Sequence, residues 1–197
     1  GCILFIVGFG FKVAAAPFHM WSPDVYQGAP TPITAFMAVG PKAASLVALF
    51  RVFHTGVGGM DGSWEMPLAV VAVASMTIGN LGAIVQTNIK RLLAYSSISH
   101  VGYILMAVIA KNSLATSSFL FYMLTYTFMI FGVFGIIIIL GKKGNENLEI
   151  EGYCGLSNKY PLLALAMAMF MLSLGGLPPL AGFVAKFYIF SAVLKEG

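Results

Sequence analysis

The sequence predicts an all-α protein that crosses a membrane several times as a bundle of transmembrane helices. Of its 197 residues, 59% are hydrophobic and only 9% are charged, whereas about 25% are charged in an ordinary soluble domain. The apolar residues form long unbroken runs, and a soluble fold of this size has too little interior to bury them. Because these runs do not alternate with polar residues, a membrane β-barrel fits poorly. The composition also excludes a cytosolic globular enzyme, a disordered chain and a disulfide scaffold.

Six apolar segments are expected to cross the membrane, because a crossing of about 30 Å needs about 20 apolar residues. They are predicted at residues 1–16, 31–53, 67–87, 92–110, 117–140 and 160–194, within a single transmembrane domain over residues 1–197. Residues 17–30 form a polar, proline-rich connection between the first two segments. The chain begins inside an apolar run without a Met or a charged leader, which we interpret as part of a longer protein.

The last segment is predicted to be discontinuous. Residues 160–194 are too many for one straight crossing, and they contain GGLPP at residues 175–179. Proline interrupts a helix, so we expect two half-helices joined by an unwound turn. In the first segment Lys12 precedes Pro17, whereas in the last segment the proline pair precedes Lys186. Two halves of inverted topology would produce this reversed order, and broken helices in matching halves indicate a transport site.

Lysine and arginine in the connections indicate how the segments are oriented. Alternate connections carry Lys90, Arg91, Lys142, Lys143 and Lys159, whereas the other side carries Arg51, Lys111 and Lys195. Because cytoplasmic loops are enriched in these residues, the first set is predicted to be cytoplasmic. The charges form no basic tract, so no nucleic-acid partner is expected.

Three lysines within the apolar segments are the most informative residues, because a charge at the centre of a membrane helix costs about 2.5–3.5 kcal/mol. Lys42 lies about 11 residues into its segment, a rise of about 16 Å, too deep for its side chain to reach the interface. Lys186 is similarly deep, whereas Lys12 could lie nearer an interface because it closely precedes Pro17. We expect these lysines to face protein or water inside the bundle.

Two alternatives for these lysines are side chains that reach the interface and buried ion pairs. The carboxylates, however, all fall in connections or near the end of the chain: Asp24, Asp61, Glu65, Glu146, Glu149, Glu151 and Glu196. The lysines are therefore expected in a hydrated cavity or beside a partner upstream of Gly1. Desolvation disfavours the charged form of a lysine, which lets the group release its proton.

His100 is a further titratable residue within an apolar segment. Ser96, His100 and Tyr103 are spaced i, i+4, i+7 and so share one face of a helix, suited to hydrogen-bonded water. Two interpretations of His100 stay open, a proton relay and a packed histidine bonded to a backbone carbonyl. Tyr122, Thr125 and Tyr126 form a second polar face for which aromatic packing is favoured, and Asn80 is expected to hydrogen-bond between helices.

The sequence carries no signature of a metal or redox site. Cys2 and Cys154 are far apart and lack metal-binding or redox spacing. No glycine-rich dinucleotide fingerprint follows a strand, and no cysteine cluster suits an iron–sulfur centre. We therefore expect this chain to bind no cofactor.

Three stretches resemble the antiporter-like membrane subunits of respiratory complex I. They are FKVAAAPFHMWSPDVYQGAPTPITAFMAVGPKAA (residues 11–44), NIKRLLAYSSISHVGY (residues 88–103) and GGLPPLAGFVAKFYIF (residues 175–190). The motif PFHMWSPDVYQGAPTP is quite specific for this family, and the resemblance extends over essentially the whole chain. It implies an antiporter-like inverted-repeat fold with two discontinuous helices. Of fourteen family helices the chain covers the seventh to the twelfth, so it is truncated at both ends.

The resemblance also implies a function, namely proton translocation through buried lysines, driven by quinone chemistry elsewhere in the complex. Lys12 matches the lysine of the first broken helix, Lys42 that of the neighbouring helix and Lys186 that of the second broken helix. His100 falls in the matching serine-rich motif and would serve as a relay. A glutamate partner of Lys12 is expected upstream.

The implied partners are the lipid bilayer, which we expect to be a bacterial inner membrane, and the other membrane subunits of complex I. Partner subunits would hold NADH, FMN, the iron–sulfur clusters and quinone. Two alternatives stay open. The chain could belong to a multisubunit cation/proton antiporter or a membrane-bound hydrogenase, or it could be a non-transporting scaffold whose lysines hold helices in register.

Overall fold

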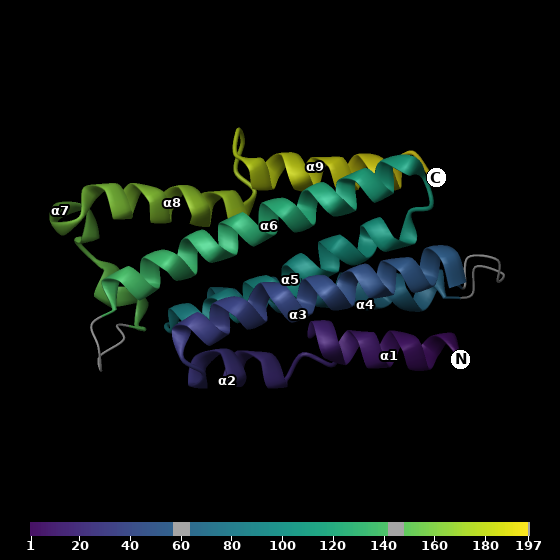
Figure 1. Cartoon of the computed structure of the whole chain (residues 1–197), viewed down its shortest axis with the longest axis horizontal. Helices are drawn as coiled ribbons and strands as arrows, with labels where there is room; N and C mark the ends of the chain where they lie inside the picture. The colour runs from purple at the N-terminus through teal and green to yellow at the C-terminus, as the bar shows by residue number, and fades with distance from the viewer. Residues whose placement is uncertain (57–63, 142–147, 197) are drawn as a thin grey trace.

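The computed structural model describes residues 1–56, 64–141 and 148–196, and this part of the chain is built from helices (Figure 1). The longer helices are α1 (Cys2–Val13), α2 (Trp21–Gly28), α3 (Thr31–Arg51), α4 (Glu65–Ile84), α5 (Ile89–Ile109), α6 (Ser113–Leu140), α8 (Pro161–Gly175) and α9 (Ala181–Leu194). A π-helical turn, Val52–Gly56, continues α3, while a 3-10 turn, Ile150–Tyr153, and α7 (Leu156–Lys159) precede α8. The all-α prediction is confirmed. Asp61, Lys142, Lys143 and Glu146 lie outside the described residues.

Among the described residues, four helices are long and apolar enough to cross a membrane. They are α3 with its π-helical turn, α4, α5 and α6, whereas α1, α8 and α9 are apolar but shorter. The predicted segments at 31–53, 67–87, 92–110 and 117–140 each fall on one of the four long helices. The six crossings and the orientation stay predictions.

The polar connection expected over residues 17–30 contains a helix that the sequence analysis did not predict. This helix, α2, holds Pro23 near its start. Proline is tolerated in the first turn, where the backbone N–H that it lacks would have no partner within the helix. A Pro- and Asp-containing stretch therefore forms a helix of two turns where its composition indicated a loop.

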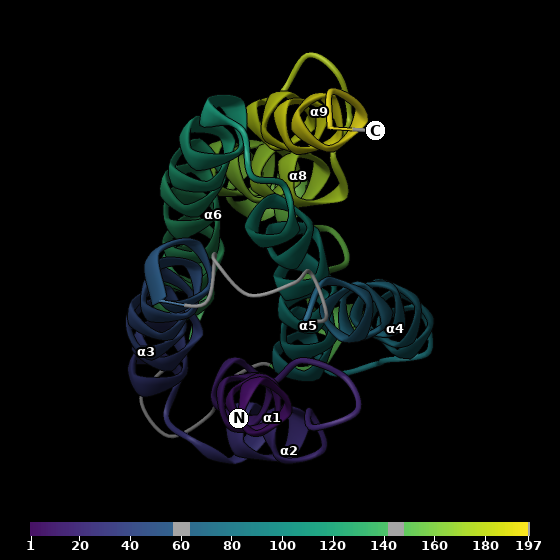
Figure 2. The same cartoon turned by 90° about the vertical axis from the view of Figure 1, so that its right-hand side faces the viewer.

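The helices that flank each proline-containing break lie end to end. Figure 1 shows α1 followed by α2 along one side of the bundle and α8 followed by α9 along the other, and the view in Figure 2 superimposes each pair. Helix α1 is capped by Ala14, which has a left-handed φ of 59°, and α8 is capped by Gly176, with a φ of 86°. That each pair forms one discontinuous membrane helix stays a prediction.

Helix α5 lies in the interior of the bundle and organises the rest. It packs against α2, α3, α4, α6 and α9, and Figure 2 shows it between the α4 side and the α3–α6 side. Its contact with α4 is close because glycines face the partner backbone. A Cβ on Gly79 would lie 2.5 Å from the Ser99 nitrogen, and one on Gly102 would lie 2.7 Å from the Ala72 oxygen. Small residues allow such close approach between membrane helices.

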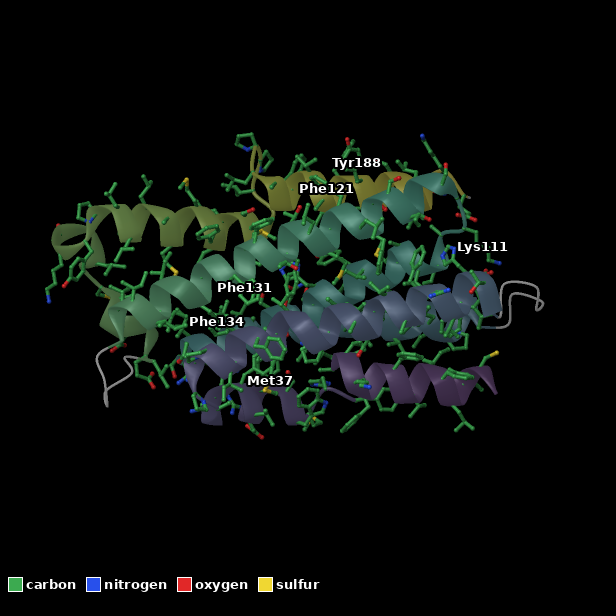
Figure 3. The ribbon with its side chains drawn as sticks, viewed as in Figure 1. Met37, Lys111, Phe121, Phe131, Phe134 and Tyr188 are labelled. Carbon is green, nitrogen blue, oxygen red and sulfur yellow. The ribbon has the colours of Figure 1, made fainter. Side chains whose placement is uncertain are left out.

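Polar contacts within the bundle complement this packing. The Ser99 hydroxyl of α5 donates to the Asn80 side-chain oxygen of α4 at 3.0 Å, which confirms the predicted contact of Asn80 between helices. On the far side, Phe121 of α6 and Tyr188 of α9 pack edge to face, with ring centroids 5.7 Å apart (Figure 3). Large apolar side chains remain exposed on the outer faces, Leu162 at 80% and Leu194 at 79%, as expected for surfaces that meet lipid or protein.

Candidate functional site

Lys42 is buried in the bundle, with only 2% of its surface exposed. Its Nζ lies 2.6 Å from the Ser97 Oγ of α5, to which it donates a hydrogen bond, and the Ser97 hydroxyl in turn donates to the Ala94 carbonyl. The Tyr26 ring of α2 lies against the same nitrogen, with its centroid 5.2 Å away. In the described part of the chain, the ion pairs join Arg91 to Asp24 and Lys111 to Glu65. The immediate partners of Lys42 are thus a hydroxyl and an aromatic face.

His100 lies in the middle of α5 and is 3% exposed. Its Nδ1 is 2.6 Å from the Tyr122 hydroxyl oxygen of α6. The Tyr126 ring packs nearby, with centroids 5.1 Å apart. The partner is therefore a side-chain hydroxyl, not the backbone carbonyl of one sequence-based alternative. The second polar face, Tyr122 to Tyr126, contributes this bond as well as the aromatic packing expected of it.

A cavity of about 410 Å³ lies between α4, α5, α8 and α9. Its polar lining groups are Asn80, Ser96, Ser99, His100, Tyr103 and Lys186. Ser96, His100 and Tyr103, whose spacing predicted a shared helix face, thus line one cavity. A volume of this size, lined by several polar groups, is large enough to hold water molecules.

Lys186 lies at the end of α8 although it belongs to α9. Its Nζ donates to the carbonyls of Leu174 and Gly175, both at 3.1 Å, and lies 4.9 Å from the Tyr103 ring centroid. The last carbonyls of a helix carry partial negative charge, so they stabilise an ammonium group. Gly176 leaves room for this side chain, because a Cβ there would lie 3.0 Å from the Lys186 Cδ.

Three residues of α5 and the two lysines that contact them form a set that we call the polar row. Its members are Lys42, Ser97, His100, Tyr103 and Lys186. Ser97, His100 and Tyr103 follow at intervals of three residues on α5, so they lie close to one another on its surface. Lys42 donates a hydrogen bond to Ser97 at one end of the row, and the Lys186 ammonium lies against the Tyr103 ring at the other end. The ring centroids of His100 and Tyr103 are 6.4 Å apart.

Lys12 is the sequence-predicted residue that the structure does not bring into the polar row. It lies in the last turn of α1 with an exposed side chain. Sequence reasoning also missed Lys90, which it treated as a charge of a connection. Lys90 is 1% exposed, at the start of α5. A signal was present, since Lys90 and Ser97 are seven residues apart and share a helix face.

The fold and the polar row define a polytopic membrane protein with ionisable groups in its interior. The chain belongs to the family described as NADH:quinone oxidoreductase/Mrp antiporter, transmembrane, whose model matches residues 1–197. The resemblance found in the three sequence stretches is therefore confirmed.

The relatives of this chain include NADH-quinone oxidoreductase subunit N of Trichlorobacter lovleyi, 53% identical over the whole chain and 40% of that protein. The protein of the same name from Desulforamulus reducens is 49% identical over the whole chain and 41% of that protein. The chain thus spans about 40% of the length of these relatives.

Two solved structures share the fold. Respiratory complex I from Thermus thermophilus with bound aureothin matches the whole chain and 42% of its own chain, with a TM-score of 0.85 and 42% identity. The Mrp complex from Dietzia matches the whole chain and 36% of its own chain, with a TM-score of 0.90 and 28% identity.

Proposed function

We propose that the full-length protein translocates protons as a membrane subunit of an NADH:quinone oxidoreductase in a bacterial inner membrane. The observation that carries the proposal is the polar row. Two lysines within apolar helices lie at its ends, and their immediate partners in the described residues are hydroxyl, carbonyl and aromatic groups. Ionisable residues inside a membrane bundle are costly and characteristically mark ion pathways.

The contacts of Lys42 suit both of its protonation states. A serine hydroxyl is both donor and acceptor, so Ser97 can accept from the ammonium or donate to the free amine. Lys42 can therefore release a proton without leaving its position. Lys186 occupies the carbonyl end of α8 beside a cavity that can hold water, where it can exchange a proton with that water or with the His100 side.

In this proposal His100 is the group that connects the two lysines. Its ring has one nitrogen bonded to Tyr122, and the imidazole reaches the same cavity as Lys186. An imidazole can take up a proton at one nitrogen and release one from the other. Lys12 would extend the row toward the segments that lie upstream in the longer relatives.

The redox chemistry belongs to partner subunits in this proposal. NADH, FMN, iron–sulfur clusters and quinone would be held there, and this chain would supply proton transfer alone. The names of the relatives at 49–53% identity support this assembly. The runner-up is a multisubunit cation/proton antiporter, which the likeness to the Mrp complex favours at the lower identity of 28%.

The assembly can be tested by purifying the affinity-tagged full-length protein from its own membranes in mild detergent. We expect it to copurify with NADH:quinone reductase activity that migrates with the protein on a native gel. Copurification with sodium/proton antiport activity and without NADH oxidation would instead establish the runner-up.

A further inference from the structure

Lys90 is a buried lysine that the proton-transfer proposal does not use. It lies at the start of α5 and is 1% exposed. Its Nζ donates to the Ala29 carbonyl at 3.0 Å. Ala29 caps the C-terminal end of α2, and its own N–H bonds the Val25 carbonyl. The ammonium group thus lies at the partially negative end of α2, where a cation stabilises a helix.

Arg91 also joins α5 to α2, through side chains of α2. Its Nη1 donates to the Asp24 carboxylate at 2.5 Å and to the Gln27 side-chain oxygen at 3.0 Å. The Asn88 side chain caps the first turn of α5, which carries both cations, because its oxygen accepts from the backbone nitrogens of Lys90 and Arg91. Such an N-cap defines the start of a helix. The first turn of α5 is therefore built to hold α2.

The helix held in this way carries Tyr26, whose ring lies against Lys42. Tyr26 is fully buried, and its ring centroid is 5.2 Å from the Lys42 Nζ. On α5, Lys90 and Ser97 are two turns apart on one face. Ser97 bonds Lys42, and Lys90 bonds the helix that places Tyr26 over Lys42. One face of α5 therefore positions both partners of the Lys42 ammonium, Ser97 directly and Tyr26 through α2.

We propose that Lys90 is a positioning residue, which holds α2 against α5 so that Tyr26 covers Lys42 and limits access of water to it. The inference rests on the proposed function, since it assigns Lys90 a task in the proton transfer of Lys42. Lys90 does not itself carry the proton. Hydrogen bonds to charged groups are stronger than neutral ones, so loss of this bond favours local opening of α2.

The experiment uses the full-length protein in membrane vesicles, with Cys2, Cys154 and every cysteine outside this chain replaced by serine. Ser22→Cys provides a reporter on α2, because Ser22 is fully buried. Labelling by a small thiol reagent is compared in Lys90→Met, Lys90→Arg and Lys159→Met backgrounds. Lys159 is the matched control, an exposed lysine of α7. Labelling of a denatured sample gives the total amount of thiol.

We expect Ser22→Cys to be labelled about tenfold faster in the Lys90→Met background. Protection should return in Lys90→Arg, which keeps a cationic donor, and persist in Lys159→Met. The protons moved per NADH oxidised should fall in Lys90→Met while NADH oxidation continues, a separation that a loss of folding alone would not produce. If Lys90→Met does not assemble, Lys90→Gln gives the same comparison.

Unchanged labelling in the Lys90 variant, or an unchanged proton yield with α2 open, would overturn the inference. Failure of the proposed function has a different result. In that case Lys42→Ala keeps the full proton yield, whereas Lys90→Met still opens α2 to the reagent.

Discussion

Replacing Lys42 with alanine in the full-length protein will lower proton pumping at least about tenfold, the scale of effect when a positioned proton-transfer group is removed. Lys42→Ala takes away the only group that joins α3 to the polar row through Ser97 in the described structure. The complex should still assemble, since deleting the ammonium also removes the cost of keeping it buried. Pumping is measured as acidification of inverted vesicles by a pH-sensitive dye after NADH addition, and assembly by native gel.

Lys159→Ala serves as the matched control for Lys42→Ala, because the same chemical change is made at an exposed lysine of α7. It should leave both pumping and assembly unchanged. Pumping at the normal rate in Lys42→Ala vesicles would remove Lys42 from the proton path. A loss of assembled complex with a normal rate per complex would favour the scaffold alternative.

The largest structural effect is expected for Gly182→Ala, which will sharply reduce the amount of assembled protein. A Cβ at this position would overlap the Ser173 carbonyl oxygen and lie 2.7 Å from its carbon. These are backbone atoms at the end of α8, and the Ser173 hydroxyl also accepts from the Gly182 nitrogen at 3.0 Å. Overpacking a core typically costs about 1–3 kcal/mol, and here no flexible side chain can move to relieve the overlap.

Gly135→Ala is the matched control for Gly182→Ala, because a Cβ at Gly135 on α6 would meet no atom within 4 Å. Protein level in membranes and thermal stability in detergent are compared for the two variants. Equal levels and equal melting temperatures would show that α8 and α9 do not pack as closely as described.

The sequence predicted the part of the site that depends on helical periodicity and on hydropathy. Ser96, His100 and Tyr103 were placed on one face by their spacing, and all three line the same cavity. Lys42 was expected in the interior because its apolar segment is too long for its side chain to reach an interface, and it is buried. Both inferences use local sequence alone, which explains why they succeed.

Features that depend on contacts between distant segments could not be predicted in this way. Lys90 follows Asn88 at the start of a helix, a position typical of a solvated charge, yet it is buried and bonds Ala29, which is 61 residues away in the sequence. The helix α2 could not be predicted from its composition, because its proline and polar residues are typical of a loop. Lys12 is exposed on α1, and this chain spans about 40% of the length of its relatives. The surroundings of Lys12 in the longer protein stay a prediction.

The most direct test of the central claim is the number of protons moved per NADH oxidised by vesicles that carry the double variant Lys42→Met, Lys186→Met. Methionine retains much of the length of the lysine side chain without its charge, so helix packing is disturbed little. We predict that the assembled complex still oxidises NADH with quinone while this ratio falls below that of the wild-type complex. A ratio equal to the wild-type value would contradict the account, because protons would then cross without either lysine of the polar row.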